Sequence, residues 1–122
     1  MFALTGNPMI IPGLMTATTG ADFPWQPYRE GVEVHQLYKR GEDGPAAAFL
    51  RYRPGARIPA HVHTGYEHIF IISGSQIDQR GSHVAGTLII NPPGSGHDVH
   101  SPEGCTVLPI WERPVQFLGN GA

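Results

Sequence analysis

The sequence of 122 residues fits one domain that buries roughly two-thirds of its unfolded surface, without room for a second core. Its net charge is −2 and its eight Lys and Arg residues do not cluster, so nucleic acid is excluded as an expected partner, because phosphate binding needs a concentrated basic face. No apolar run is long enough to span a bilayer. The single cysteine, Cys105, cannot close an internal disulfide, so we expect a cytoplasmic protein.

Residues 1–22 are expected to form an extended N-terminal arm. Residues 1–21 carry no charged side chain, and Gly and Pro interrupt the apolar residues, which is not the pattern of a signal peptide. Because an arm with this much apolar surface is unfavourable in water, it should pair as an edge strand on its own sheet or exchange with a neighbour in a homodimer. A partly disordered terminus is the alternative. Residues 23–122 are expected to form a single barrel domain.

The remainder of the chain has the pattern of an all-β protein. The whole sequence has sixteen Gly and twelve Pro, and those after the arm divide it into short β-type segments, with no window of helical period. The Gly-Glu-Asp-Gly sequence at 41–44 predicts a hairpin turn. The expected strands are 32–40, 46–53, 57–63, 67–73, 75–80, 87–91, 97–100 and 105–113. Segments of this length and spacing are typical of a β-sandwich or barrel.

Alternation along these strands predicts which side chains face the interior. In 46–53, Leu50 and Tyr52 share one parity and the charged Arg51 and Arg53 share the other, so Leu50 and Tyr52 should point inward. An inward arginine that binds a ligand carboxylate is the alternative. The residues expected to line a pocket are Leu50, Tyr52, Ile69, Ile71, Leu88, Ile90 and Val99.

Four side chains are candidate metal ligands: His61, His63, Glu67 and His97. Because successive side chains of a strand alternate faces, His61 and His63 point the same way, and a bend at Gly65 would let Glu67 reach the same side. Three imidazoles and one carboxylate suit one divalent transition metal ion, with zinc or iron expected foremost and nickel or manganese compatible. The other histidines, His35, His68, His83 and His100, are expected on the surface or in hydrogen bonds.

The spacing of these residues resembles the two-part signature of the cupins. The first part consists of Gly55, His61, His63, Glu67 and Gly74, and the second consists of Gly86, Pro92, Gly94 and His97. This resemblance implies a double-stranded β-helix, or jelly-roll, barrel of two packed antiparallel sheets. The second part of the signature usually ends in Asn, where this chain has Ser101. The hydrogen bond of that Asn must therefore be made by a shorter side chain or be lost.

Within the cupins, residues 49–113 resemble the C-terminal cupin domain of the ChrR-type zinc anti-sigma factors and its stand-alone relatives. The similar segments are 53–55, 75–81, 85–87, 91–97 and 103–105. The resemblance implies metal contacts for His61, His63, Glu67 and His97. It does not imply anti-sigma activity, because that activity needs a preceding helical zinc domain for which this chain has no room.

Two classes of function follow from such a site. A metal-dependent dioxygenase, hydrolase or isomerase would act on a small oxygen-bearing compound, with proton transfer by Tyr52, a metal-bound water or Glu67. A zinc-binding sensor of a ligand or an oxidant would work without catalysis. A barrel that has lost its metal is a third alternative. The lack of an output domain favours the enzyme.

Overall fold

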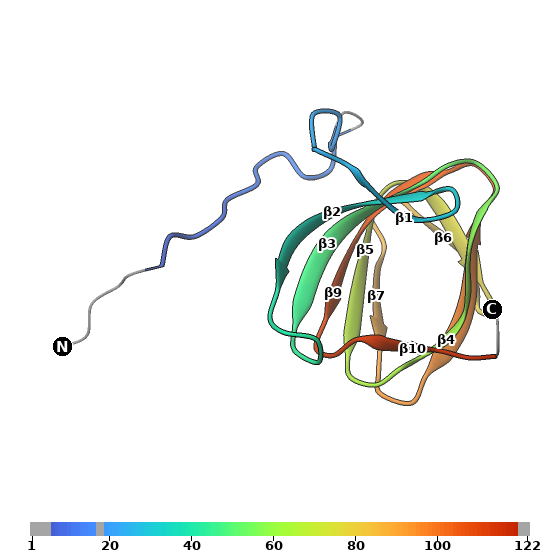
Figure 1. Ribbon diagram of the computed structural model, residues 1–122. Coiled ribbons are helices and arrows are strands. Elements are labelled where there is room, and N and C mark those ends of the chain that lie inside the picture. The colour runs from blue at the N-terminus through green and yellow to red at the C-terminus, as the bar shows by residue number, and fades with distance from the viewer. Residues whose placement is uncertain (1–5, 17–18, 120–122) are drawn as a thin grey trace.

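The computed structural model describes residues 6–16 and 19–119 and contains ten strands among them. One antiparallel sheet comprises β1 (Gln26–Arg29), β2 (Val32–Lys39), β3 (Ala46–Tyr52), β9 (Cys105–Trp111) and β7 (Leu88–Asn91). A second sheet comprises β4 (Ala56–His63), β8 (Gly96–Ser101), β10 (Val115–Phe117) and β6 (Gly81–Val84). The long strand β5 (Glu67–Asp78) belongs to both, so the sheets form one curled barrel (Figure 1). The predicted all-β cupin barrel is confirmed.

Strand β5 passes from one sheet to the other at Gly74. Its first part pairs with β9 and β7, whereas Ser75–Asp78 pairs with β6. The sequence predicted two separate strands, 67–73 and 75–80, but the structure has one continuous strand through Gly74. Gly74 has φ +72°, and a Cβ at this position would lie 2.1 Å from the carbonyl oxygen of Gly104. Only glycine allows this close approach without a shift of the backbone.

The interior of the barrel is apolar at its closed end. A cluster of buried side chains fills it, comprising Val32, Leu50, Tyr52, Ala56, Ile58, Ile69, Ile71, Val99, Cys105 and Val107. The predicted inward direction of Leu50 and Tyr52 is confirmed, because both are almost completely buried. Arg51 points outward, and its guanidinium lies 2.7 Å from the Glu33 carboxylate.

The N-terminal segment leaves the barrel in Figure 1, and residues 6–16 form no strand. Met9 and Ile10 are 63% and 79% exposed. These residues therefore do not add an edge strand to their own sheet, whereas exchange with a second chain stays a prediction. Residues 1–5 and 17–18 of the arm lie outside the described residues. Between the arm and β1, the ring of Phe23 packs against that of Phe49 of the barrel, with 4.9 Å between the ring centroids.

The described residues include no helix that is long and apolar enough to cross a membrane.

Candidate metal centre

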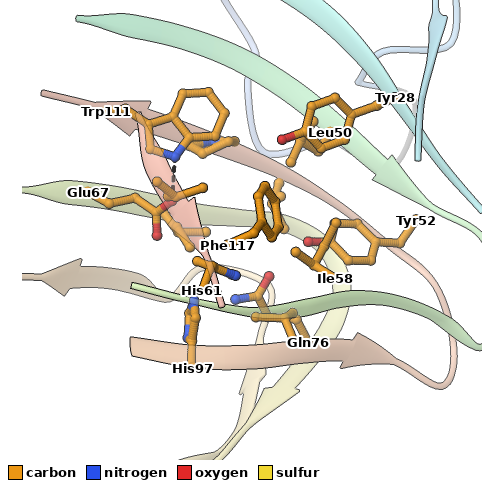
Figure 2. Close-up of a pocket in the computed structure, with 15 residues that line it drawn as sticks. Tyr28, Leu50, Tyr52, Ile58, His61, Glu67, Gln76, His97, Trp111 and Phe117 are labelled. Carbon is orange, nitrogen blue, oxygen red and sulfur yellow. Dashed lines mark hydrogen bonds between the residues drawn. The ribbon is translucent and has the colours of Figure 1, made fainter. Parts of the chain in front are cut away.

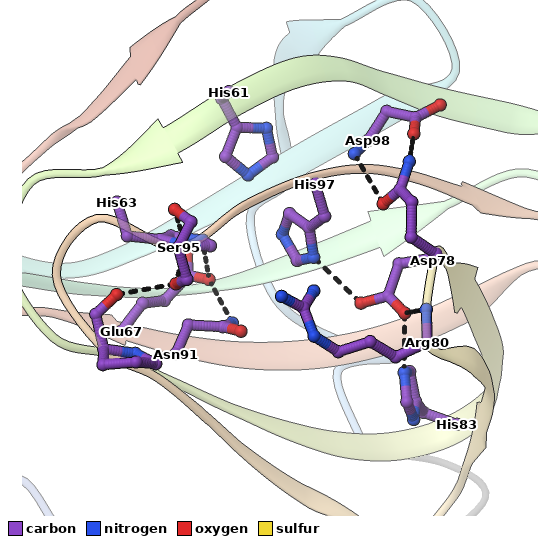
Figure 3. A network of polar contacts seen from close by, with 12 residues as sticks. His61, His63, Glu67, Asp78, Arg80, His83, Asn91, Ser95, His97 and Asp98 are labelled. Carbon is purple, nitrogen blue, oxygen red and sulfur yellow. Dashed lines mark hydrogen bonds and ion pairs between the residues drawn. The ribbon is translucent and has the colours of Figure 1, made fainter.

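Three histidines converge inside the barrel from two adjacent strands. His61 and His63 alternate with Val62 on β4, and His97 on β8 is the register partner of His61. Each has one ring nitrogen in a group whose members lie within 4.8 Å of one another. All three side chains are buried, at 5% exposure or less. The structure thus brings together three of the four predicted ligands, as Figure 3 shows.

The Nδ1 atom of each ring is already engaged. Nδ1 of His61 lies 2.8 Å from the carbonyl oxygen of Pro59, and Nδ1 of His63 lies 3.0 Å from that of Ser95. Nδ1 of His97 lies 2.9 Å from the Asp78 carboxylate. Because a carbonyl or carboxylate oxygen can only accept, these contacts place the proton on Nδ1 and leave the Nε2 lone pair free.

The free Nε2 atoms fit a divalent transition metal. Nε2 of His97 is buried without a hydrogen-bond partner, and Nε2 of His63 has only a Glu67 carboxylate oxygen beside it, at 2.9 Å. Both arrangements are costly unless a cation binds there. Burial lowers the pKa of His61, so its imidazole is neutral at pH 7, the form that binds a metal. Imidazole donors suit zinc, iron, nickel and manganese, and this geometry does not distinguish among them.

Glu67, the fourth predicted ligand, lies beside the cluster but is not among its three members. One carboxylate oxygen is 2.9 Å from Nε2 of His63 and accepts a hydrogen bond from Asn91 at 3.1 Å, and the other accepts one from the indole of Trp111. Burial raises the pKa of Glu67, but the contact with His63 and the nearby histidines outweigh it and hold the pKa below its usual range. Glu67 is therefore an anion next to the centre, and its role as a ligand stays a prediction.

Asp78 is a functional residue that the sequence reasoning missed. Besides His97, its carboxylate accepts hydrogen bonds from His83 at 3.0 Å and from the backbone of Arg80 at 2.9 Å (Figure 3). Burial raises its pKa, but these three hydrogen bonds prevail and lower it. The register shift between Ile71 and Ser73 changes which residues of β5 face inward. A simple alternation along the sequence could not reveal this.

The turn before β8 links the second half of the signature to the first. Gly94 has φ +88°, and the backbone N–H of Ser95 donates to the carbonyl of Pro92 at 3.1 Å. The turn places Ser95 so that both its carbonyl and its hydroxyl contact Nδ1 of His63. Ser101, in place of the usual Asn, is buried and donates a hydrogen bond to the carbonyl of Ser75. The shorter side chain therefore keeps a hydrogen bond between β8 and β5.

A small cavity lined by His61 and His97 lies inside the barrel (Figure 2). Its interior has about 30 Å³ for water-sized molecules, which is room for about two waters. Of the predicted lining residues, Leu50, Tyr52, Ile69 and Val99 line it. The cavity is also lined by residues that strand alternation did not predict, namely Tyr28, Ile58, Gln76, Val107, Pro109, Trp111, Val115 and Phe117.

Three predicted pocket residues lie elsewhere, which corrects the expectation. Ile71 is completely buried in the core and does not line the cavity. Leu88 and Ile90 are exposed, at 55% and 54%, whereas Ile89 between them packs on the core. Since Leu88, Ile89 and Ile90 are all apolar, alternation of polarity could not establish which face of β7 turns inward.

Tyr52 is the buried tyrosine among the described residues that line the cavity. Burial raises its pKa well above the usual value, and the nearby Cys105, Glu67 and Tyr28 raise it further. At neutral pH the hydroxyl is therefore protonated and can donate a hydrogen bond, whereas deprotonation to a base is disfavoured.

A barrel of this topology with three converging histidines defines a cupin with a candidate metal centre. Residues 15–115 match the model of the ChrR cupin-like domain. The chain belongs to that family, as its sequence motifs predicted.

Solved structures agree with this assignment. A protein of unknown function with a cupin-like fold from Ralstonia eutropha JMP134 is 25% identical over 67% of this chain and 55% of that chain, with a TM-score of 0.63. The anti-sigma ChrR structure in complex with SigE, from Rhodobacter sphaeroides, is 25% identical over 74% of this chain and 50% of that chain, with a TM-score of 0.66. This chain spans about half the length of these two relatives.

An acetylacetone dioxygenase from Acinetobacter johnsonii has the same fold over more of the chain. Its identity is 15%, the match covers 98% of this chain and 86% of that chain, and the TM-score is 0.72. At this identity the likeness concerns the fold alone. A comparison with curated proteins found no match.

Proposed function

We propose that this chain is a metal-dependent enzyme of dioxygenase-like type that acts on a small oxygen-bearing compound. The observation that carries the proposal is the position of the three histidines, whose ring nitrogens converge beside a cavity that His61 and His97 line. Three protein ligands at a cavity wall leave coordination positions for a substrate, as catalytic sites require. Zinc or iron is the expected ion, one per chain, with nickel or manganese as compatible alternatives.

A bound ion would supply Lewis acidity and, in the case of iron, redox chemistry. The protein supplies the remaining functions. His61, His63 and His97 would hold the ion, while the apolar side chains of Leu50 and Val99 exclude water from a substrate. Tyr52, kept protonated, would donate a hydrogen bond to an oxygen atom of the substrate.

The dioxygenase version is supported by the shared fold of the acetylacetone dioxygenase. It is tested by oxygen uptake of the Fe(II)-loaded protein with a panel of β-diketones, including acetylacetone, and catechols. We expect uptake with at least one compound that falls to background in His61→Ala. His68→Ala removes a histidine outside the three-histidine group, at a half-buried position of β5 next to Glu67, and is the matched control. No uptake across the panel would contradict the dioxygenase proposal.

A zinc-binding sensor of a ligand or an oxidant is the second candidate, and the position of Glu67 favours it. Its carboxylate lies 2.9 Å from Nε2 of His63, so a small displacement could complete a shell of four donors, which closes a structural zinc site. In that case Glu67→Gln should lower zinc affinity more than about 100-fold. If Trp111 and Asn91 instead hold Glu67 away from the ion, the loss should stay within about tenfold.

We also propose that the chain forms a homodimer through its arm. The exposed Met9 and Ile10 have no apolar partner within their own barrel in the described residues. The outer face of β7 and β9 presents apolar side chains of its own, including Leu88, Ile90 and Ile110. Contact between the arm of one chain and this face of another would remove both surfaces from water.

A further inference from the structure

The side chain of Gln76 is a buried amide without a protein partner. Gln76 lies on β5, past the register shift between Ile71 and Ser73, and lines the cavity. It is 1% exposed, and neither its amide nitrogen nor its amide oxygen has a hydrogen bond. A buried polar group that lacks partners destabilises the fold, so such a group usually has a role other than packing.

Comparable polar side chains of this barrel do find partners. The buried amide of Asn91 donates to the Glu67 carboxylate at 3.1 Å. The buried hydroxyl of Ser101 donates to a backbone carbonyl of β5. An apolar side chain at position 76 would fill the same space without this cost. The amide is therefore best explained by contacts with a polar molecule in the cavity, such as water or a ligand that displaces it.

The surroundings of Gln76 indicate what kind of molecule this is. Figure 2 shows the amide turned into the cavity between His61 and Tyr52. The remaining wall near it is apolar, with Ile58 and Val99, and no Lys or Arg of the described residues lines the cavity. A primary amide offers a donor and an acceptor, so it binds carbonyl and hydroxyl oxygens alike. Without a cationic side chain, the site disfavours ligands that bring several negative charges into the barrel.

We propose that Gln76, together with the hydroxyl of Tyr52, forms a polar subsite that binds an oxygen atom of a small carbonyl- or hydroxyl-bearing ligand. This inference rests on the proposed function, because it places the subsite in the cavity that leads to the metal centre. Four residues, Tyr28, Trp111, Val115 and Phe117, line both this cavity and a second one of about 230 Å³ nearer the mouth. An apolar tail of the ligand can therefore extend toward the mouth while its oxygen stays at Gln76.

The test uses Gln76→Met, which keeps the length of the side chain and removes both amide atoms. Gln79→Met makes the same change at an exposed position, where the amide bonds to Asp98, and is the control. Isothermal titration calorimetry of the zinc-loaded proteins measures two probes. Acetylacetone offers oxygen atoms, whereas ethanethiol binds a metal through a sulfur that is only a weak hydrogen-bond acceptor.

We expect Gln76→Met to bind acetylacetone at least about tenfold more weakly, the effect of one lost hydrogen bond. Binding of ethanethiol should be unchanged, and Gln79→Met should behave as the original protein. The melting temperature without ligand should be equal or higher, because the unpartnered amide is gone.

The outcomes separate this inference from the proposed function. Equal acetylacetone affinity in the original protein and Gln76→Met would overturn the subsite and leave the metal centre intact. Weaker binding of both probes, or a lower melting temperature and loss of zinc in Gln76→Met, would overturn it too, because the residue would then be structural. If neither probe binds to the original protein, the open metal position fails and the subsite fails with it.

Discussion

The hydrogen bond between Asp78 and His97 should determine how tightly the centre holds its ion. The two atoms lie 2.9 Å apart, and each side chain is only 1% exposed, so water cannot replace the contact. Asp78→Asn keeps the size and one acceptor oxygen but removes the negative charge that favours the Nδ1-protonated ring of His97. A hydrogen bond to a charged group contributes about 1.5–3 kcal/mol, and partners of metal-bound histidines typically change metal affinity 10–100-fold.

We therefore expect Asp78→Asn to weaken zinc binding by a factor of about 10–100, or about 1.4–2.8 kcal/mol. The assay is competition for zinc against a chelating dye at pH 7. Asp98→Asn is the control, because Asp98 is adjacent to His97 in sequence but bonds to Gln79 instead. If folded Asp78→Asn binds zinc within twofold of the original protein, the inference that Asp78 orients His97 is refuted.

Three further predictions concern the turn, the thiol and the arm. In Gly94→Val a β-branched residue must adopt φ +88°, so Ser95 and His63 should be displaced and the metal content should fall. A variant whose metal content by elemental analysis equals that of the original protein would contradict this. Burial raises the pKa of the Cys105 thiol from 9.0 to about 11, so the folded state keeps the proton to a higher pH than the unfolded state does. The contribution of this group to the free energy of unfolding should thus be fully present below pH 9, and the free energy of unfolding should fall by about 3 kcal/mol as the pH rises through 11. Urea denaturation should show a shallower fall in Cys105→Ala. Light scattering should give twice the chain mass of 13.2 kDa for the full chain and the monomer mass after removal of residues 1–22, whereas a monomer in both would exclude the exchanged arm.

Features that depend on spacing and local chemistry were predictable from the sequence. The hairpin between β2 and β3 follows from its glycine turn, and the pairing of His61 with His63 on one face follows from strand alternation. That His97 lies with these two histidines could be predicted from the cupin-like spacing alone. Strands β1, β6 and β10, each of four residues or fewer, were missed, since segments so short carry little periodicity.

Features that depend on long-range register were not predictable. Asp78 and Gln76 face the barrel only because β5 shifts register before them and changes sheet at Gly74. The exposed positions of Leu88 and Ile90 were misjudged because the strand is apolar on both faces. Local pattern cannot settle such cases, since they are decided by the pairing of β5 and β7.

The metal content of the purified protein tests the central claim most directly. Protein prepared without added metal, then equilibrated with zinc or Fe(II) and freed of excess, should contain about one ion per chain by elemental analysis. His61→Ala should lose most of that ion, while His68→Ala, which removes a histidine outside the cluster, should retain it. A folded original protein that contains no stoichiometric metal after equilibration with either ion, or a His61→Ala variant that binds as much as the original, would contradict the account.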